Sequence, residues 1–165
     1  MARLPLPVEG SEIEESSEDA RPPPPPDLDG ELARAEPGGN YLFMSYARRD
    51  REQVDGVIDA ARSVGHEVWT DASLHAGPGW AGEIVKAMKA SEGVIVCCSV
   101  GAFESDHVKR EVYLADRFKK RLLPVFLENI EPPDDFLYFF ADRQWLYAHE
   151  SDLDELRERI ADALA

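Results

Sequence analysis

Residues 93–99 read GVIVCCS, and this stretch decides the fold class because it is apolar on both faces. Neighbouring residues of a strand point to opposite faces, so a half-exposed strand would alternate polar and apolar residues. A strand that is apolar throughout is typical of a parallel sheet covered by helices on both sides. Adjacent cysteines in such a strand could form only a strained disulfide. We therefore expect Cys97 and Cys98 to be buried, reduced thiols.

The flanking sequence predicts an alternation of strands and helices. Strands are predicted over the apolar runs 41–46 (YLFMSY), 66–71 (HEVWTD), 121–127 (RLLPVFL) and 144–147 (QWLY). Helices are predicted where apolar residues recur at helical spacing, over 50–65, 80–91, 105–120 and 151–165. This order gives an α/β fold: a flavodoxin-like, doubly wound, five-stranded parallel sheet with helices on both faces.

Single residues predict where several elements begin, end or distort. Gly65 is placed to end the first long helix, and Ser105 and Ser151 are placed to cap two later ones. Pro124 lies inside a predicted strand but cannot donate to its hydrogen-bond ladder. We expect a local irregularity at Pro124.

Charge and composition exclude several classes of partner. The 165 residues carry a net charge of −15, which disfavours nucleic acid and anionic membranes. No apolar run is long enough to span a membrane, and the first residues lack the apolar core of a signal peptide. We therefore expect a cytoplasmic protein. No His or Cys cluster has metal-ligand spacing, so no metal site is predicted.

Residues 1–40 differ from the rest of the chain. They hold ten acids, three arginines and the run PPPPP at 22–26, with few large apolar side chains. Such a segment buries too little surface to offset the entropy of ordering, so we predict a disordered acidic tail before a domain at 41–165. The proline run is interpreted as a stiff spacer, and a ligand for a proline-binding module is the alternative.

In a doubly wound fold, ligands bind beyond the carboxyl ends of the strands. Three segments reach that edge: residues 45–48, 71–80 and 99–111. Glu111 follows Val108 by three residues and precedes Val112, which places it at the edge of the predicted buried face. There it could reach a cleft, or it could pair on the surface with Lys109 or a neighbouring Arg.

Four stretches together resemble a Toll/interleukin-1 receptor (TIR) domain of the bacterial type. They are YLFMSYARRD at 41–50, VWTDASLHAGPGWAGEI at 68–84, VIVCCS at 94–99 followed by SDHVKREVYLA at 105–115, and RLLPVFL at 121–127. The likeness covers residues 41–165 and follows the order of the family's motifs. A phosphoacceptor receiver domain shares the fold class, but the first strand ends in MSYARRD without an acidic pair. No G-x-G-x-x-G follows a strand, which argues against a Rossmann dinucleotide loop.

The resemblance implies a reaction and a site. Many TIR domains cleave NAD+ between nicotinamide and ribose, with NAD+ as substrate and no further cofactor, and they act on self-association. By resemblance Glu111 is the catalytic glutamate. The residues implied to line the site, or to reach it from a neighbouring molecule, are Ser45, Tyr46, Arg48, Leu74, Gly77, Trp80 and Ser105.

Each lining residue also has an ordinary structural explanation. Tyr46 and Trp80 could be core anchors, Gly77 could serve backbone geometry, and Ser105 could act only as a cap. Asp71 is expected to order the loop rather than bind ligand.

One residue departs from the family pattern. TIR domains often have an aromatic residue, typically Trp, four residues before the glutamate, and this chain has His107 there. We assign His107 no acid–base role from sequence, because nothing in the sequence places a proton donor or acceptor beside it. The alternative function is a module without turnover that binds other TIR domains, in a scaffold or an effector. His107 favours that alternative, whereas Glu111 favours the enzyme.

Overall fold

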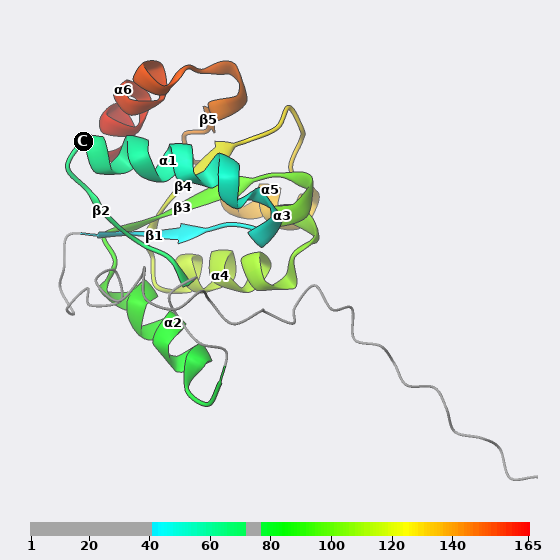
Figure 1. The fold of residues 1–165 in the computed structure, drawn as a ribbon. Coiled ribbons are helices and arrows are strands. Elements are labelled where there is room, and N and C mark those ends of the chain that lie inside the picture. Colours follow the sequence, from blue (N-terminus) through cyan, green and yellow to red (C-terminus); the bar gives the residue numbers. More distant parts are fainter. Residues whose placement is uncertain (1–40, 72–76) are drawn as a thin grey trace, which may run out of the picture.

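The computed structural model describes residues 41–71 and 77–165 (Figure 1). The predicted tail at 1–40 and the predicted site residue Leu74 lie outside the described residues. The sheet has five parallel strands in the order β2-β1-β3-β4-β5, as the flavodoxin-like prediction requires. Their bounds are β1 Tyr41–Ser45, β2 Glu67–Trp69, β3 Gly93–Cys98, β4 Arg121–Phe126 and β5 Leu146–Tyr147.

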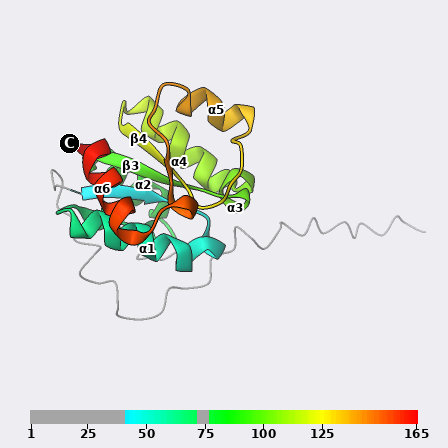
Figure 2. The same ribbon diagram turned by 90° about the horizontal axis from the view of Figure 1, so that it is seen from above.

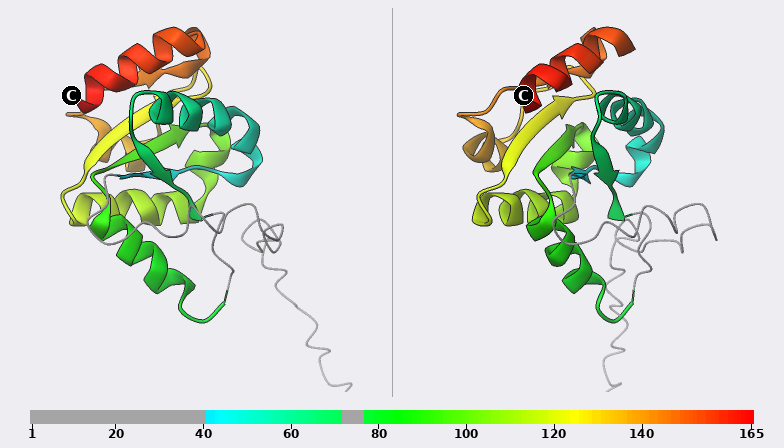
Figure 3. Two further views of the ribbon diagram at one scale, coloured as in Figure 1. Left: turned by 60° about the vertical axis from the view of Figure 1, so that its left-hand side comes forward. Right: turned by 90° about the vertical axis from the view of Figure 1, so that its left-hand side faces the viewer.

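Helices cover both faces of the sheet, with α1 and α6 on one side and α2 and α4 on the other (Figure 3). The view from above shows α1 and α6 side by side (Figure 2). The bounds are α1 Arg51–Ser63, α2 Trp80–Ala90, α3 Val100–Glu104, α4 Asp106–Arg117, α5 Asp134–Phe140 and α6 Leu153–Leu164, with 3-10 turns η2 at Arg48–Asp50 and η4 at Ala148–Glu150. The sequence analysis missed α3 and α5, because five and seven residues are too few to show a clear helical period.

Strand alternation divides the core into two layers. Tyr41 and Phe43 of β1 face the layer under α2 and α4, whereas Leu42 and Met44 face the layer under α1 and α6. The same alternation sends Cys98 to the first layer and Cys97 to the second, and both thiols are buried and free, as predicted. β3 is buried on both faces along its whole length, which is why its sequence is apolar throughout.

Two local predictions were wrong. Pro124 causes no break: β4 pairs with β3 continuously, with Pro124 opposite Val96. On its other side β4 pairs with β5 only at Val125 and Phe126, so within residues 41–71 and 77–165 no strand lies beside Pro124 on that side to lose a hydrogen bond. The cap of α6 is Asp152 rather than Ser151, because the Asp152 carboxylate accepts the Glu155 N–H at 2.9 Å.

The other two predicted boundaries hold. Gly65 follows the end of α1 with φ of +95°, a left-handed conformation that glycine adopts without strain. Ser105 caps α4, and its hydroxyl accepts the Val108 N–H at 3.3 Å. Over residues 41–71 and 77–165, no helix is long and apolar enough to cross a membrane.

Candidate functional site

The Glu111 carboxylate lies at the carboxyl end of β1, buried between α4 and the sheet. Ser45, the last residue of β1, donates its hydroxyl hydrogen to Glu111 Oε2 at 2.5 Å. Glu111 is only 2% exposed, and on α4 it shares the buried face with Val108, Val112 and Ala115. The sequence placed Glu111 at the edge of that face. In the structure Glu111 lies within that buried face, because Ser45 at the end of β1 gives its carboxylate a polar partner there.

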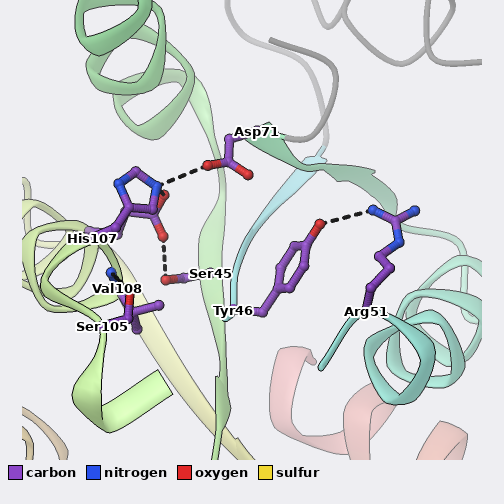
Figure 4. Close-up of polar contacts among 8 residues, drawn as sticks. Ser45, Tyr46, Arg51, Asp71, Ser105, His107 and Val108 are labelled. Carbon is purple, nitrogen blue, oxygen red and sulfur yellow. Dashed lines mark hydrogen bonds and ion pairs between the residues drawn. The ribbon is translucent and has the colours of Figure 1, made fainter. Parts of the chain in front are cut away.

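His107 lies one turn before Glu111 and joins it to Asp71. Its Nε2 is 2.8 Å from Glu111 Oε1. The same atom is 2.9 Å from Asp71 Oδ2, a contact that Figure 4 marks with a dashed line. All three side chains are largely buried, at 13% exposed for His107, 9% for Asp71 and 3% for Glu111. Nε2 therefore lies within hydrogen-bond distance of both carboxylates. The sequence placed no proton partner beside His107, and the structure corrects this by placing two carboxylates there. Asp71 was expected to order its loop rather than bind ligand, and in the structure its carboxylate contacts His107.

Trp80 packs against the same histidine from the start of α2. The two rings are stacked, with centroids 5.2 Å apart and planes 20° apart. Gly79 precedes Trp80 with φ of +90°, which sets the direction in which α2 begins. Trp80 is half-buried. It fixes the plane of the His107 ring, and with it the position of Nε2 between the two carboxylates.

Burial raises the pKa of the Glu111 carboxyl above its ordinary value. The hydrogen bond and charge of His107 act in the opposite direction, as does the Ser45 hydroxyl, whereas the nearby Asp71 carboxylate raises the pKa further. The pKa nevertheless stays raised, so Glu111 is a carboxylate that the fold holds at an energetic disadvantage. Such groups concentrate at functional sites.

The same three residues present oxygen and nitrogen atoms that could ligate a metal. One such atom from each of Asp71, His107 and Glu111 lies within 4.8 Å of the others. The sequence could not reveal this set because Asp71 lies 36 residues before His107, although His107 and Glu111 are one helical turn apart. Each of these atoms also takes part in the hydrogen bonds described above. We interpret the cluster as a hydrogen-bonded network around Glu111.

The sequence profile of the TIR domain family matches residues 42–161. This chain belongs to the TIR domain family. Among solved structures, it is similar to the TIR domain of the Toll-related receptor TRR-2 from Hydra magnipapillata. The identity is 19%, the TM-score is 0.61, and the match covers 75% of this chain and 98% of that domain. No curated protein sequence matches this chain.

A second similar structure is a metazoan TIR-STING receptor from C. gigas in complex with 2',3'-cGAMP. The identity is 23% and the TM-score is 0.59, over 78% of this chain and 40% of the receptor chain. At these identities the likeness supports the fold alone, which agrees with the strand order and the helix layers of this TIR domain.

The TIR fold does not bring all the predicted site residues together. Tyr46 follows Ser45 in the chain and therefore points to the opposite face, where it packs in the core layer of α1 and α6. Its hydroxyl accepts a hydrogen bond from Arg51 Nη1 at 2.9 Å, and Figure 4 shows this pair on the other side of β1 from Ser45 and His107. The alternation of side chains along a strand is the sequence signal that separates Ser45 from Tyr46.

The remaining predicted residues surround the network rather than enter it. Ser105 caps α4, as its sequence position also allowed. Arg48 begins η2, two residues after the end of β1, and is half-buried. Gly77 is exposed, and its carbonyl accepts the Trp80 N–H at 3.1 Å, so it shapes the entry to α2. Of the lining residues, Ser45 bonds Glu111 directly and Trp80 contacts it through His107.

Proposed function

We propose that this TIR domain cleaves NAD+ at the bond between nicotinamide and the ribose C1′ carbon. The observation that supports this most strongly is the buried Glu111 carboxylate, which is held by Ser45 and His107 at the carboxyl edge of the sheet. A fixed carboxylate in a dry setting stabilises developing positive charge far better than one in water. The neighbouring Asp71 adds a second acidic group on the side of His107.

In the proposed reaction the C1′–N bond breaks and its electron pair leaves with nicotinamide, which becomes neutral. The ribose that remains is an oxocarbenium-like cation. Glu111 stabilises that cation and orients the ribose hydroxyls. Water then adds to C1′ and releases a proton, which gives ADP-ribose, or a nucleophile within the same molecule adds and gives a cyclic form. Because the leaving group departs readily, Glu111 need not attack C1′.

Substrate contact requires a rearrangement around His107. Glu111 is 2% exposed and both of its oxygens already have partners. A ribose hydroxyl can reach the carboxylate only if His107 gives up its hydrogen bond or moves aside. Self-association of TIR domains, which the family resemblance led us to expect, could supply the energy for that movement. Activity should then rise more steeply than linearly with protein concentration.

The test measures nicotinamide release from NAD+ by the pure protein over a concentration series. We expect release above a threshold concentration and its loss in Glu111→Gln. The matched control is Glu158→Gln on the exposed face of α6, which should leave the rate unchanged. Wild-type protein that self-associates without releasing nicotinamide would overturn the proposal.

The second candidate function is a TIR–TIR interaction module without turnover. The same burial of Glu111 favours it, because a carboxylate whose two oxygens are both engaged holds α4 on the sheet without contacting a substrate. In that case Glu111→Gln and the wild type self-associate equally well, and neither protein releases nicotinamide from NAD+.

A further inference from the structure

One surface of the domain remains unexplained by the proposed reaction. It lies on α4 and α5 and consists of Tyr113, Leu137, Tyr138 and Phe139, called here the α4–α5 aromatic face. Tyr113 is 58% exposed, Leu137 39% and Tyr138 80%. The Phe139 ring lies edge-on to both tyrosines, with centroids 6.4 Å from Tyr113 and 5.2 Å from Tyr138. Clustered exposed aromatic rings of this kind mark a binding surface.

Positive charge accompanies these rings on an otherwise acidic protein. Residues 106–120 contain five lysines or arginines against three acids, whereas the whole chain has 18 basic and 33 acidic residues. One of those three acids is Glu111, which is buried. A cleft on α4 is lined by Asp106, Lys109, Arg110, Tyr113 and Leu114. On α5 the face also carries Asp134 and Asp135, and Lys109 is already paired with Asp135 at 3.1 Å. Arg110 and Arg117 are exposed on α4, three residues before and four residues after Tyr113, so these two cations are the ones that the face offers to an acidic ligand beside its rings.

The chain itself contains such a segment outside the described residues. Residues 22–31 read PPPPPDLDGE, five prolines followed by three acids. Each proline has a fixed φ, so the run loses little entropy on binding as a polyproline II helix. Proline-rich segments are recognised by grooves lined with aromatic side chains. We propose that residues 22–31 dock on the α4–α5 aromatic face of the same molecule, with prolines against Tyr113 and Tyr138 and the acids near the basic residues of α4.

The linker between this segment and the domain is long enough. Nine residues lie between Glu31 and Tyr41, and the ten Cα–Cα steps from one to the other can span about 33–36 Å when extended. α4 has 12 residues and is therefore only about 18 Å long. Tyr41 is the first residue of β1, and it donates its hydroxyl hydrogen to the Ala87 carbonyl on α2. The Tyr41 side chain therefore lies on the face of the sheet that α4 also covers. A tether this short gives an effective concentration in the millimolar range, which is enough for a weak contact to form in cis.

A nitroxide on the tail of the full-length chain tests the proposal by NMR. The label is attached to Leu28→Cys, next to the proline run, and Cys97 and Cys98 do not compete because both are 0% exposed. We expect selective attenuation of the amide signals around Tyr113 and Tyr138. The double variant Tyr113→Ser/Tyr138→Ser should abolish it. The control Leu153→Ser, at a 52% exposed leucine on α6, should leave it unchanged.

Three results would overturn the proposal. The first is attenuation that is absent or lies on another face, and the second is attenuation that survives the double tyrosine variant. The third is attenuation in a mixture of ¹⁵N-labelled chains without a nitroxide and nitroxide-labelled chains without ¹⁵N. That result would assign the contact to a second copy. Replacement of Pro22–Pro26 by serines should remove the attenuation as the tyrosine variant does. None of these outcomes depends on NAD+ cleavage.

Discussion

Replacing Glu111 by glutamine should stabilise the folded protein at neutral pH. The amide is isosteric with the carboxylate, its carbonyl oxygen can accept from His107 Nε2, and Ser45 keeps a polar partner. The substitution therefore removes mainly the cost of holding a charge at a site that is 2% exposed. Functional carboxylates of this kind commonly cost stability, and we expect a gain of about 1 kcal/mol for Glu111→Gln. For a domain of this size that corresponds to roughly 3–5 °C in Tm.

The pH dependence of that gain is the sharper test. Because burial raises the pKa of Glu111, the folded protein binds this proton more tightly than the unfolded chain does. Glu111 therefore contributes stability at acidic pH, and the contribution is lost as the pH rises through its folded pKa. Thermal melts of wild type and Glu111→Gln from pH 4 to pH 8 should show a gap that is largest at high pH and closes on acidification. A glutamine variant that is less stable than wild type at pH 7.5, or a gap that does not change with pH, would refute the reasoning.

Further predictions concern the network and one helix cap. If NAD+ is cleaved, activity should fall on acidification as Glu111 takes up its proton, with an apparent pKa above that of an ordinary glutamate. Ser45→Ala removes a hydrogen bond that lowers the pKa of Glu111, so the acidic limb of the rate profile should move to higher pH. Asp71→Asn removes a charge that raises the same pKa and should move the acidic limb to lower pH. If the acidic limb moves in the same direction in Ser45→Ala and Asp71→Asn, the network is contradicted. Asp152→Ala should cost about 1 kcal/mol in urea unfolding through loss of the α6 cap, with Glu158→Gln near zero as the control.

The fold was predictable because most of its strands and helices show a recognisable pattern in their own local sequence. The apolar run of β3, the alternating layers of β1 and the helical spacing in α1, α2, α4 and α6 are all local patterns. α3 and α5 escaped because each is shorter than the window in which a helical period can be recognised. The prediction at Pro124 was wrong because a strand tolerates proline where no neighbouring strand needs its N–H. The sequence of β4 does not show that β5 is too short to pair with Pro124.

The candidate site was predictable only in part. Ser45 is the last residue of β1 and Glu111 lies inside α4, and the sequence indicates both the end of that strand and the presence of that helix. The contact between His107 and Asp71 joins residues 36 apart, so no spacing motif could reveal it. Tyr46 was grouped with Ser45 because both lie at the end of the first strand and match the first motif of the family, although adjacent strand residues face opposite layers. In this site, the face of the sheet to which a strand residue points tells more about its neighbours than its closeness in sequence does.

The role of Glu111 is tested most directly by the rate of nicotinamide release from NAD+ at pH 7.5, measured for wild type and Glu111→Gln at a concentration where both self-associate. We predict that the variant is at least about 100-fold slower, the usual loss when a preorganised group that stabilises transition-state charge is removed. Because Glu111→Gln is predicted to be more stable than wild type, unfolding of the variant would not explain its slower rate. Equal rates, or no release by self-associated wild type, would contradict the enzymatic role and leave the TIR–TIR interaction module as the function.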